Sequence, residues 1–133
     1  MTNRELMERA VCARKNSYSP YSGFRVGAAL LTKSGKVYTG CNVENAAYTP
    51  TNCAERTAIF KAVSEGEREF SAIAVVGGKG EEIASVCTPC GVCRQVLAEF
   101  CEKDFKILVG TPEAIRGFTL EELLPESFGK SNL

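Results

Sequence analysis

Two short cysteine segments constrain this chain more than any other feature of its sequence. The first spans residues 52–56 (NCAER) and the second residues 88–94 (TPCGVCR), and each leads into a pattern typical of a helix. Together they supply three thiols, one carboxylate and two arginines. The chain contains no histidine. Any metal site must therefore use Cys, Asp or Glu, and a general base near neutral pH must be something other than imidazole.

The composition indicates an ordinary globular protein and excludes several classes of partner. A length of 133 residues predicts a single domain over 1–133, and 44% hydrophobic with 24% charged residues is typical of soluble proteins. Sixteen basic residues balance sixteen acidic ones, so no nucleic-acid partner is expected. No stretch is long enough to span a membrane, and no signal peptide is evident. An odd number of cysteines, seven, argues against a disulfide framework and predicts a reducing cytoplasm.

The periodicity predicts helix, strand, strand, helix, strand, helix, strand and a short final helix. A hairpin followed by two strand–helix–strand crossovers predicts an α/β fold, a three-layer α/β/α arrangement with one mixed β-sheet. The elements are expected as a capped helix from Thr2 to near Asn16, strands at 24–32 and 37–43, a helix from Cys53 to near Gly66, a strand at 70–76, a helix after Cys93, a strand at 105–109 and a short capped helix after Thr119.

Two further features have both a structural and a functional interpretation. Asn42 and Glu44 lie two residues apart near the end of the second strand, so they would project from one face of it. They are either part of a site or a solvated strand end, and the pattern alone favours neither. The turn-rich segment 17–23 (SYSPYSG) is either plain loop chemistry around its proline or the wall of a pocket.

The cysteines allow four interpretations. Cys90 and Cys93 have the spacing of a thiol–disulfide redox pair. With Cys87 they repeat every three residues, as in part of an iron–sulfur ligand run. Cys53, Cys90 and Cys93 together would form a three-thiolate zinc site. Plain buried cysteines are the fourth possibility, and it is favoured for Cys12, Cys41 and Cys101.

The zinc interpretation explains more of the neighbouring residues than the others do. Three protein ligands leave the fourth tetrahedral position open for water, and zinc makes that water more acidic. Glu55 lies two residues after Cys53, close enough to exchange protons with the water without being a ligand. Helix N-termini, Arg56 and Arg94 would offset the negative charge of three thiolates, and both arginines can donate hydrogen bonds to sulfur.

These residues resemble the zinc-dependent cytidine deaminase family, specifically the small homotetrameric type that acts on free nucleosides. The family motifs stand here as residues 53–56 (CAER) and 89–95 (PCGVCRQ). Relatives often have serine at the position of Thr88, and threonine keeps the hydroxyl group. The resemblance covers nearly the whole chain and includes residues 18–22 (YSPYS), Phe24, residues 26–29 (VGAA), 40–45 (GCNVEN) and 123–125 (LLP), and Phe128 with Gly129.

The resemblance implies hydrolytic deamination of cytidine and deoxycytidine to uridine and deoxyuridine, as a step of pyrimidine salvage. Cys53, Cys90 and Cys93 would hold one zinc ion per chain. Zinc-bound hydroxide would attack C4 of the pyrimidine and ammonia would leave, with Glu55 as the proton shuttle that also hydrogen-bonds the ring nitrogen.

The same resemblance implies how the nucleoside is bound. The backbone N–H of Ala54 would meet the carbonyl oxygen of the base, and Asn42 with Glu44 would bind the ribose 3′-hydroxyl. Phe24 would stack near the base. Tyr48 and Phe128 would complete the pocket from neighbouring subunits of a homotetramer. A blasticidin-type deaminase and a zinc-stabilised binding module without catalysis remain the alternatives. Glu55 distinguishes an enzyme from the binding module, because catalysis needs this carboxyl and zinc binding alone does not.

Overall fold

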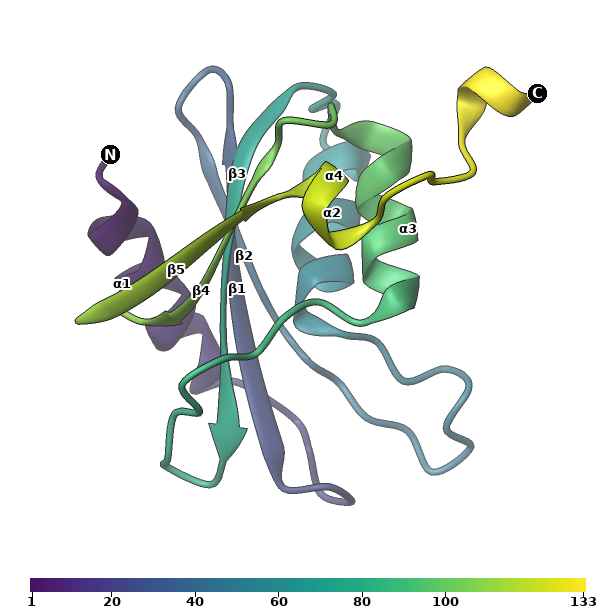
Figure 1. Ribbon diagram of the computed structural model, residues 1–133. Coiled ribbons are helices and arrows are strands. Elements are labelled where there is room, and N and C mark those ends of the chain that lie inside the picture. Colours follow the sequence, from purple (N-terminus) through teal and green to yellow (C-terminus); the bar gives the residue numbers. More distant parts are fainter.

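The computed structural model describes residues 1–133 and contains one five-stranded mixed sheet with helices on both faces (Figure 1). The strands lie in the order β2-β1-β3-β4-β5. This confirms the predicted mixed sheet. The elements are α1 (Asn3–Arg14), β1 (Phe24–Thr32), β2 (Val37–Cys41), α2 (Ala54–Ser64), β3 (Phe70–Lys79), α3 (Gly91–Phe100), β4 (Lys106–Thr111), β5 (Ala114–Thr119), α4 (Leu120–Leu123) and a 3-10 turn (Lys130–Asn132).

The sheet is antiparallel except at one strand pair. β1 pairs antiparallel with β2 on one side and with β3 on the other, and β4 pairs antiparallel with β5. β3 and β4 are parallel, with Ile73 opposite Ile107. A parallel pair needs a crossover connection, which α3 supplies here. Because β1 lies between β2 and β3, those two strands run in the same direction, and α2 connects them.

Two apolar layers, one on each face of the sheet, account for the three-layer architecture. Figure 1 shows α1 on one side of the sheet and α2 with α3 on the other. Ala28 and Leu30 of β1 are buried in the cluster under α2 and α3, whereas Ala29 is buried in the cluster under α1. Alternate residues of a strand point to opposite faces, so this one strand contributes to both layers. None of the helices is both long and apolar enough to cross a membrane.

Local capping signals place the first and last α-helices as predicted. The Thr2 hydroxyl accepts a hydrogen bond from the backbone of Glu5, whose carboxylate accepts one from the backbone of Thr2. Thr119 and Glu122 form the same reciprocal pair at α4. Each pair satisfies N–H groups that the helix leaves without partners, and this fixes where the helix begins.

The predicted boundaries are wrong at three strands, one of which is β4 (Lys106–Thr111 rather than 105–109), and the predicted element list omits β5. β2 ends at Cys41 rather than at residue 43, because the Asn42 side chain bonds to the backbone of Phe24 and Val26. β3 continues through Gly77 and Gly78 to Lys79. A Cβ atom at Gly78 would lie 2.1 Å from the carbonyl oxygen of Glu82, so the glycine lets the following loop fold back against the strand.

Strand β5 was not predicted at all. It is an edge strand, and its sequence (AIRGFT) mixes charged, small and aromatic residues instead of alternating cleanly. The guanidinium of Arg116 lies 5.2 Å from the centre of the Phe118 ring, so the charged residue packs on its aromatic neighbour. An edge strand with one solvated face needs few apolar residues, and its sequence signal is correspondingly weak.

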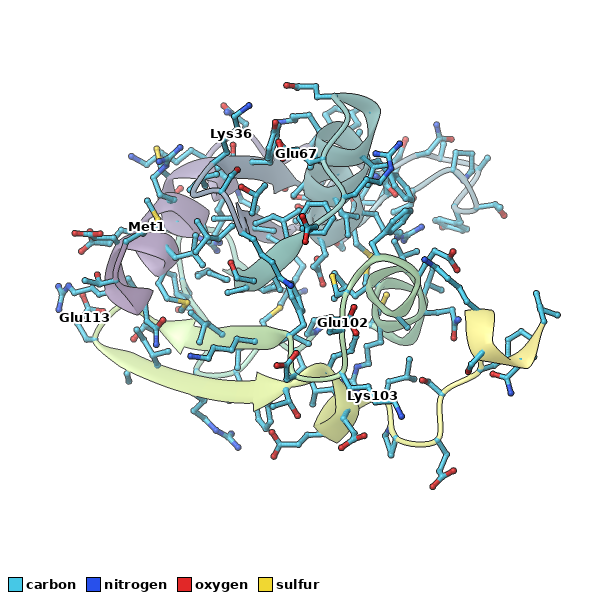
Figure 2. The ribbon with its side chains drawn as sticks, turned by 90° about the horizontal axis from the view of Figure 1, so that it is seen from above. Met1, Lys36, Glu67, Glu102, Lys103 and Glu113 are labelled. Carbon is cyan, nitrogen blue, oxygen red and sulfur yellow. The ribbon has the colours of Figure 1, made fainter.

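Surface ion pairs contribute little to holding these elements together. Seen from above (Figure 2), Lys36 of the β1–β2 turn lies beside Glu67 of the α2–β3 connection, with 3.9 Å between Nζ and Oε2. The Lys36 side chain is exposed, so such a pair is worth at most about 1 kcal/mol. The close packing of helices on the sheet is the larger contribution.

A substitution at Gly27 of β1 tests how closely α1 packs on the sheet. A Cβ atom there would lie 2.1 Å from the carbonyl oxygen of Ala10 and 2.5 Å from the backbone nitrogen of Arg14, so α1 would have to move. We expect Gly27→Ala to lower the free energy of unfolding by about 1–3 kcal/mol or more, as measured by urea denaturation. Gly117→Ala is the matched control, since its Cβ would meet nothing closer than 3.7 Å. Equal stability of the two variants would contradict this account of the packing.

Candidate active site

Three thiols meet at the N-termini of two helices. Cys53 is the N-cap residue of α2, Cys90 is the N-cap residue of α3, and Cys93 lies in the first turn of α3. Their sulfur atoms all lie within 4.8 Å of one another. The Cys53 and Cys90 sulfurs are 3.7 Å apart. Tetrahedral zinc with Zn–S bonds of about 2.3 Å separates its sulfurs by about 3.8 Å, so the cluster fits a zinc site.

The other cysteines stay outside this cluster. Cys87 is half-buried, and burial raises the pKa of its thiol to about 11. It is not among the thiols that meet at the helix ends, so the iron–sulfur interpretation has no fourth cysteine ligand. Cys41 and Cys101 are half-buried. Cys12 is exposed, so the expectation of a buried core residue is wrong for it.

Positive charge surrounds the sulfurs from the helix ends and from one arginine. Neither Cys53 nor Cys90 uses its side chain as a capping group, so the first-turn N–H groups of both helices remain available toward the site. Nη2 of Arg56 donates a hydrogen bond to the Cys53 sulfur at 3.2 Å. Nε of Arg56 is buried without a hydrogen-bond partner. An unpaired buried donor beside three sulfurs suits a site that gains negative charge when the thiols ionise.

Arg94 does not donate to the sulfurs as predicted. Its Nε donates to the carbonyl oxygen of Pro89 at 2.7 Å, and its Nη1 donates to the carbonyl oxygen of Leu123, also at 2.7 Å. These bonds tie the second cysteine segment to the end of α4. Arg94 therefore holds the segment in place, and the direct hydrogen bond to sulfur comes from Arg56.

One thiol of the cluster is poised to be negative. The pKa of Cys53 falls to about 5, chiefly because it accepts a hydrogen bond from Cys93, with a smaller contribution from Arg56, while burial opposes the change. The pKa of Cys93 is raised because its proton is shared with Cys53 and because it is buried. Hydrogen bonds from Cys93 and Arg56 thus stabilise a thiolate at Cys53 even without a metal cation, as a thiolate ligand site requires.

Glu55 lies on the buried side of the cluster. It is the second residue of α2 and is only 4% exposed. The pKa of its carboxyl is raised to about 7, chiefly by burial and in smaller part by the neighbouring Cys53, while a backbone hydrogen bond and the charge of Arg56 oppose the rise. A carboxyl with such a pKa can both hold and release a proton near neutral pH. It therefore has the properties of a general acid and base beside the metal position.

Asn42 lies against β1 rather than on a regular strand. Its Oδ1 accepts hydrogen bonds from the backbone of Val26 at 2.9 Å and from the hydroxyl of Ser17 at 2.5 Å. Its Nδ2 donates to the carbonyl oxygen of Phe24 at 2.8 Å. These bonds fix the orientation of the amide and leave one of its N–H groups free. Asn42 is thus held beside Phe24, so the two residues are close enough to belong to the same binding site.

Glu44 is held by the preceding loop. Its Oε1 accepts hydrogen bonds from the backbone of Tyr21 at 2.9 Å and of Ser22 at 3.1 Å, and its Oε2 accepts one from the Ser22 hydroxyl. The bond from the Ser22 hydroxyl is the largest cause of a pKa below the usual range for this carboxyl. Glu44 borders a cavity of about 270 Å³ that is also lined by Tyr21, Ser22, Asn45, Tyr48 and Thr51.

Ser17 and Ser22 are the site residues that the sequence analysis missed. They lie in the 17–23 segment, whose sequence predicts either a loop or a pocket wall and distinguishes none of its side chains. Serine is common in turns for its own backbone bonds, so its type gives no signal of a contact with residues 22 or 25 positions away. Only the folded backbone shows that these hydroxyls face Asn42 and Glu44.

Two of the predicted substrate residues have mostly exposed side chains and lie outside the regular helices and strands. Tyr48 is 75% exposed on the loop between β2 and α2, and it has a φ of 63°, a conformation that non-glycine residues seldom adopt. Phe128 is 60% exposed in the C-terminal tail, where its carbonyl oxygen accepts a hydrogen bond from Gln95. Figure 1 shows that tail extending from the body of the molecule beyond α3.

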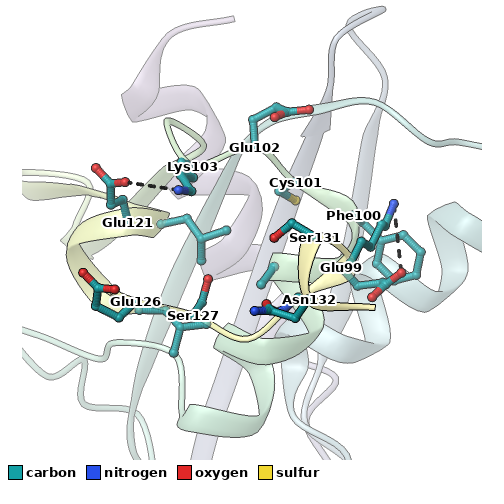
Figure 3. Close-up of a pocket in the computed structure, with 15 residues that line it drawn as sticks. Glu99, Phe100, Cys101, Glu102, Lys103, Glu121, Glu126, Ser127, Ser131 and Asn132 are labelled. Atoms are coloured by element: carbon teal, nitrogen blue, oxygen red, sulfur yellow. Dashed lines mark hydrogen bonds and ion pairs between the residues drawn. The ribbon is translucent and has the colours of Figure 1, made fainter.

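A second cavity of about 500 Å³ lies between the C-terminal end of α3, α4 and the C-terminal tail (Figure 3). None of the predicted site residues lines it. Ion pairs of Lys103 with Glu121 at 3.9 Å and of Lys130 with Glu99 at 4.0 Å lie at its rim. Because these charges are exposed and the three clustered thiols lie elsewhere, the cysteine cluster and not this cavity is the candidate for chemistry.

A mixed sheet with three thiols at two helix ends and a buried carboxyl beside them is the arrangement of a zinc-dependent hydrolase. Comparison with known proteins specifies the family. Residues 1–109 match the model of the cytidine and deoxycytidylate deaminase zinc-binding region. The chain is 50% identical to a cytidine deaminase of Halalkalibacterium halodurans, over 96% of this chain and 95% of the relative. It is 48% identical to one of Sporosarcina psychrophila, over 100% of this chain and 96% of the relative.

A solved structure agrees with the sequence comparisons. The crystal structure of cytidine deaminase from Burkholderia pseudomallei matches with a TM-score of 0.89 and 47% identity, over 96% of this chain and 100% of that one. The chain therefore belongs to the family of zinc-binding cytidine and deoxycytidylate deaminases.

The metal site can be tested without an activity assay. We expect the purified protein to contain one zinc ion per chain, and Cys93→Ser to lose most of it, because a serine hydroxyl is a far weaker zinc ligand than a thiolate. Metal content would be measured by mass spectrometry after dialysis. Cys87→Ser and Cys12→Ser are the matched controls and should keep their zinc. Loss from Cys87→Ser as complete as from Cys93→Ser would point to four cysteine ligands.

Proposed function

We propose that residues 1–133 act as one cytidine deaminase domain, which converts cytidine and deoxycytidine with water to uridine and deoxyuridine with release of ammonia. The observation that carries this proposal is the buried carboxyl of Glu55 beside three clustered thiols. A redox pair would need neither Glu55 nor Cys53. The reaction fits a role in pyrimidine salvage in the cytoplasm, where a reducing environment keeps the thiols free to bind metal.

In this proposal Cys53, Cys90 and Cys93 hold the zinc ion. When bound, zinc supplies a Lewis acid that makes a water molecule acidic enough to lose its proton near neutral pH. Glu55 would accept that proton and deliver it to the ring nitrogen of the base, and would then carry a second proton, from the hydroxyl group added at C4, to the departing amino group, so that the C4–N bond breaks and ammonia leaves. Its pKa of about 7 suits both directions of transfer. Arg56 offsets the negative charge of the sulfur that it contacts.

The neighbouring residues would orient the nucleoside. Ala54 is the first residue of α2 and is fully buried, and its backbone N–H has no partner within the helix, so it can donate to the carbonyl oxygen of the base. The free N–H of Asn42 and the carboxylate of Glu44 would bind the 3′-hydroxyl. The ring of Phe24 would stack near the base. The sugar contacts favour a nucleoside over a free base.

Tyr48 and Phe128 would complete the pockets of neighbouring subunits in a homotetramer. Both side chains are large, aromatic and mostly exposed in the single chain. Exposed aromatic residues on projecting segments are typical of surfaces that bind another molecule. This arrangement would close the substrate pocket at a subunit interface.

Glu55→Gln tests the mechanism. The amide keeps the size of the side chain but cannot move a proton, so we expect kcat to fall by about 10²–10⁴-fold or more while zinc content and fold are retained. The change in ultraviolet absorbance from cytidine to uridine and the release of ammonia measure the activity. A fully active Glu55→Gln protein would refute the proposed role.

The same assay separates the substrate classes. Cytidine and deoxycytidine should be deaminated by the unaltered protein, and cytosine and blasticidin S should not. Turnover of blasticidin S in preference to cytidine would favour the blasticidin-type alternative. Bound zinc without turnover of any of these compounds would favour a binding module.

Phe128→Ala tests completion of the pocket by a neighbour. Loss of an aromatic surface against the substrate should raise KM about tenfold or more, with Ser127→Ala as the unaffected control. Light scattering should give the mass of four chains for the unaltered protein. When Phe128→Ala and Glu55→Gln chains are co-expressed, some sites should regain the KM and kcat of the unaltered protein. These are the sites in which the intact Glu55 of one chain meets the intact Phe128 of another. Absence of any regain would place Phe128 in the pocket of its own chain.

A further inference from the structure

The Ser22 hydroxyl lies between two residues of the proposed nucleoside site. It accepts a hydrogen bond from the backbone N–H of Phe24 at 2.9 Å and donates one to Oε2 of Glu44. The backbone N–H groups of Tyr21 and Ser22 hold the other carboxylate oxygen. Ser22 is thus the side chain that connects the residue expected to stack on the base with the residue expected to bind the sugar.

The Phe24 backbone is fixed from both sides by this network. Ser22 binds its N–H group, and Nδ2 of Asn42 donates to its carbonyl oxygen at 2.8 Å. Residues 22 and 24 belong to the start of β1 and the turn before it, whereas Asn42 and Glu44 follow β2. Two hydrogen-bonded bridges therefore join the two segments, one through Asn42 and one through Ser22 and Glu44.

We propose that Ser22 is a positioning residue that fixes the Glu44 carboxylate for the 3′-hydroxyl of the substrate, an inference that rests on the proposed function. A carboxylate oxygen accepts about two hydrogen bonds. Oε1 already accepts two from the backbone, whereas Oε2 accepts one from Ser22 and keeps one position free. Oε2 is consequently the atom that receives the sugar hydroxyl, and Ser22 sets its direction.

Positioning of this kind affects selectivity more than fold. Glu44 is only half-buried, so without the Ser22 hydroxyl its Oε2 has no protein partner and turns toward water, while Oε1 keeps its two backbone bonds. A preorganised acceptor binds a hydroxyl at little entropic cost and is left without its partner when the substrate has none. A mobile, hydrated carboxylate contributes less binding free energy when the substrate has a 3′-hydroxyl. It also costs less binding free energy when the substrate lacks that hydroxyl. Ser22 therefore controls how strongly the enzyme distinguishes a nucleoside with a 3′-hydroxyl from one without it.

The test compares cytidine with 3′-deoxycytidine in steady-state kinetics. For Ser22→Ala we expect kcat/KM for cytidine to fall about tenfold, mostly through KM, and kcat/KM for 3′-deoxycytidine to change less than about threefold. Ser22→Thr keeps the hydroxyl and should restore most of the selectivity. Ser19→Ala is the matched control, because Ser19 lies in the same loop and its hydroxyl contacts the Ser17 hydroxyl, not Phe24 or Glu44.

Two further variants make the outcome decisive. Ser22→Cys has nearly the same volume but a weak donor, so it should reproduce the loss in Ser22→Ala and would carry the test if the alanine variant failed to fold. In a Glu44→Gln background, Ser22→Ala should cause little additional loss. Equal losses for both substrates, or no loss for either, would overturn the proposal. Turnover of cytidine by the unaltered protein tests the proposed function separately, since it does not depend on Ser22.

Discussion

The clustering of three sulfur atoms at two helix N-termini is the interaction on which the rest of the site depends. Thiols that ionise this close together repel one another unless positive charge is supplied, and the helix ends and Arg56 supply it. The sheet topology makes this possible. β2 and β3 run in the same direction on either side of β1, so the helices that follow them, α2 and α3, both begin at the carboxyl ends of their strands. Sites form at that edge in open α/β sheets for the same reason.

Gly77 joins the metal half of the site to the substrate half. A Cβ atom at this position of β3 would lie 2.7 Å from the Cys87 sulfur and 3.0 Å from the Phe24 ring. The absence of a side chain lets Cys87, the residue directly before the second cysteine segment, pack on β3 beside the Phe24 ring. A side chain at position 77 would have to displace one or both of these groups, because the interior is closely packed.

The sequence predicts those parts of this structure whose signals are local. Capping pairs such as Thr2 with Glu5 fix helix starts through contacts three residues apart, and β1 carries its apolar run within nine residues. The spacing of the cysteines and Glu55 is equally local within each segment. The end of β2 at Cys41, the bond from Arg94 to the carbonyl oxygen of Leu123 and the bond from Ser22 to Glu44 depend on residues 16 to 29 positions away. Strand β5 is missed because an edge position places few demands on its residues.

The loop that carries Tyr48 is ordered by its own hydrogen bonds rather than by the core. The Tyr48 N–H donates to the carbonyl oxygen of Asn45 at 2.9 Å, and the Thr51 N–H donates to the carbonyl oxygen of Tyr48 at 2.8 Å. These bonds hold Tyr48 at a φ of 63°, which costs on the order of 1 kcal/mol for a residue with a side chain. A strained backbone that directs an aromatic ring into solvent contributes nothing to the stability of the single chain. In the proposed homotetramer the ring would contact a neighbouring chain, where a ring already fixed in place loses little entropy on binding.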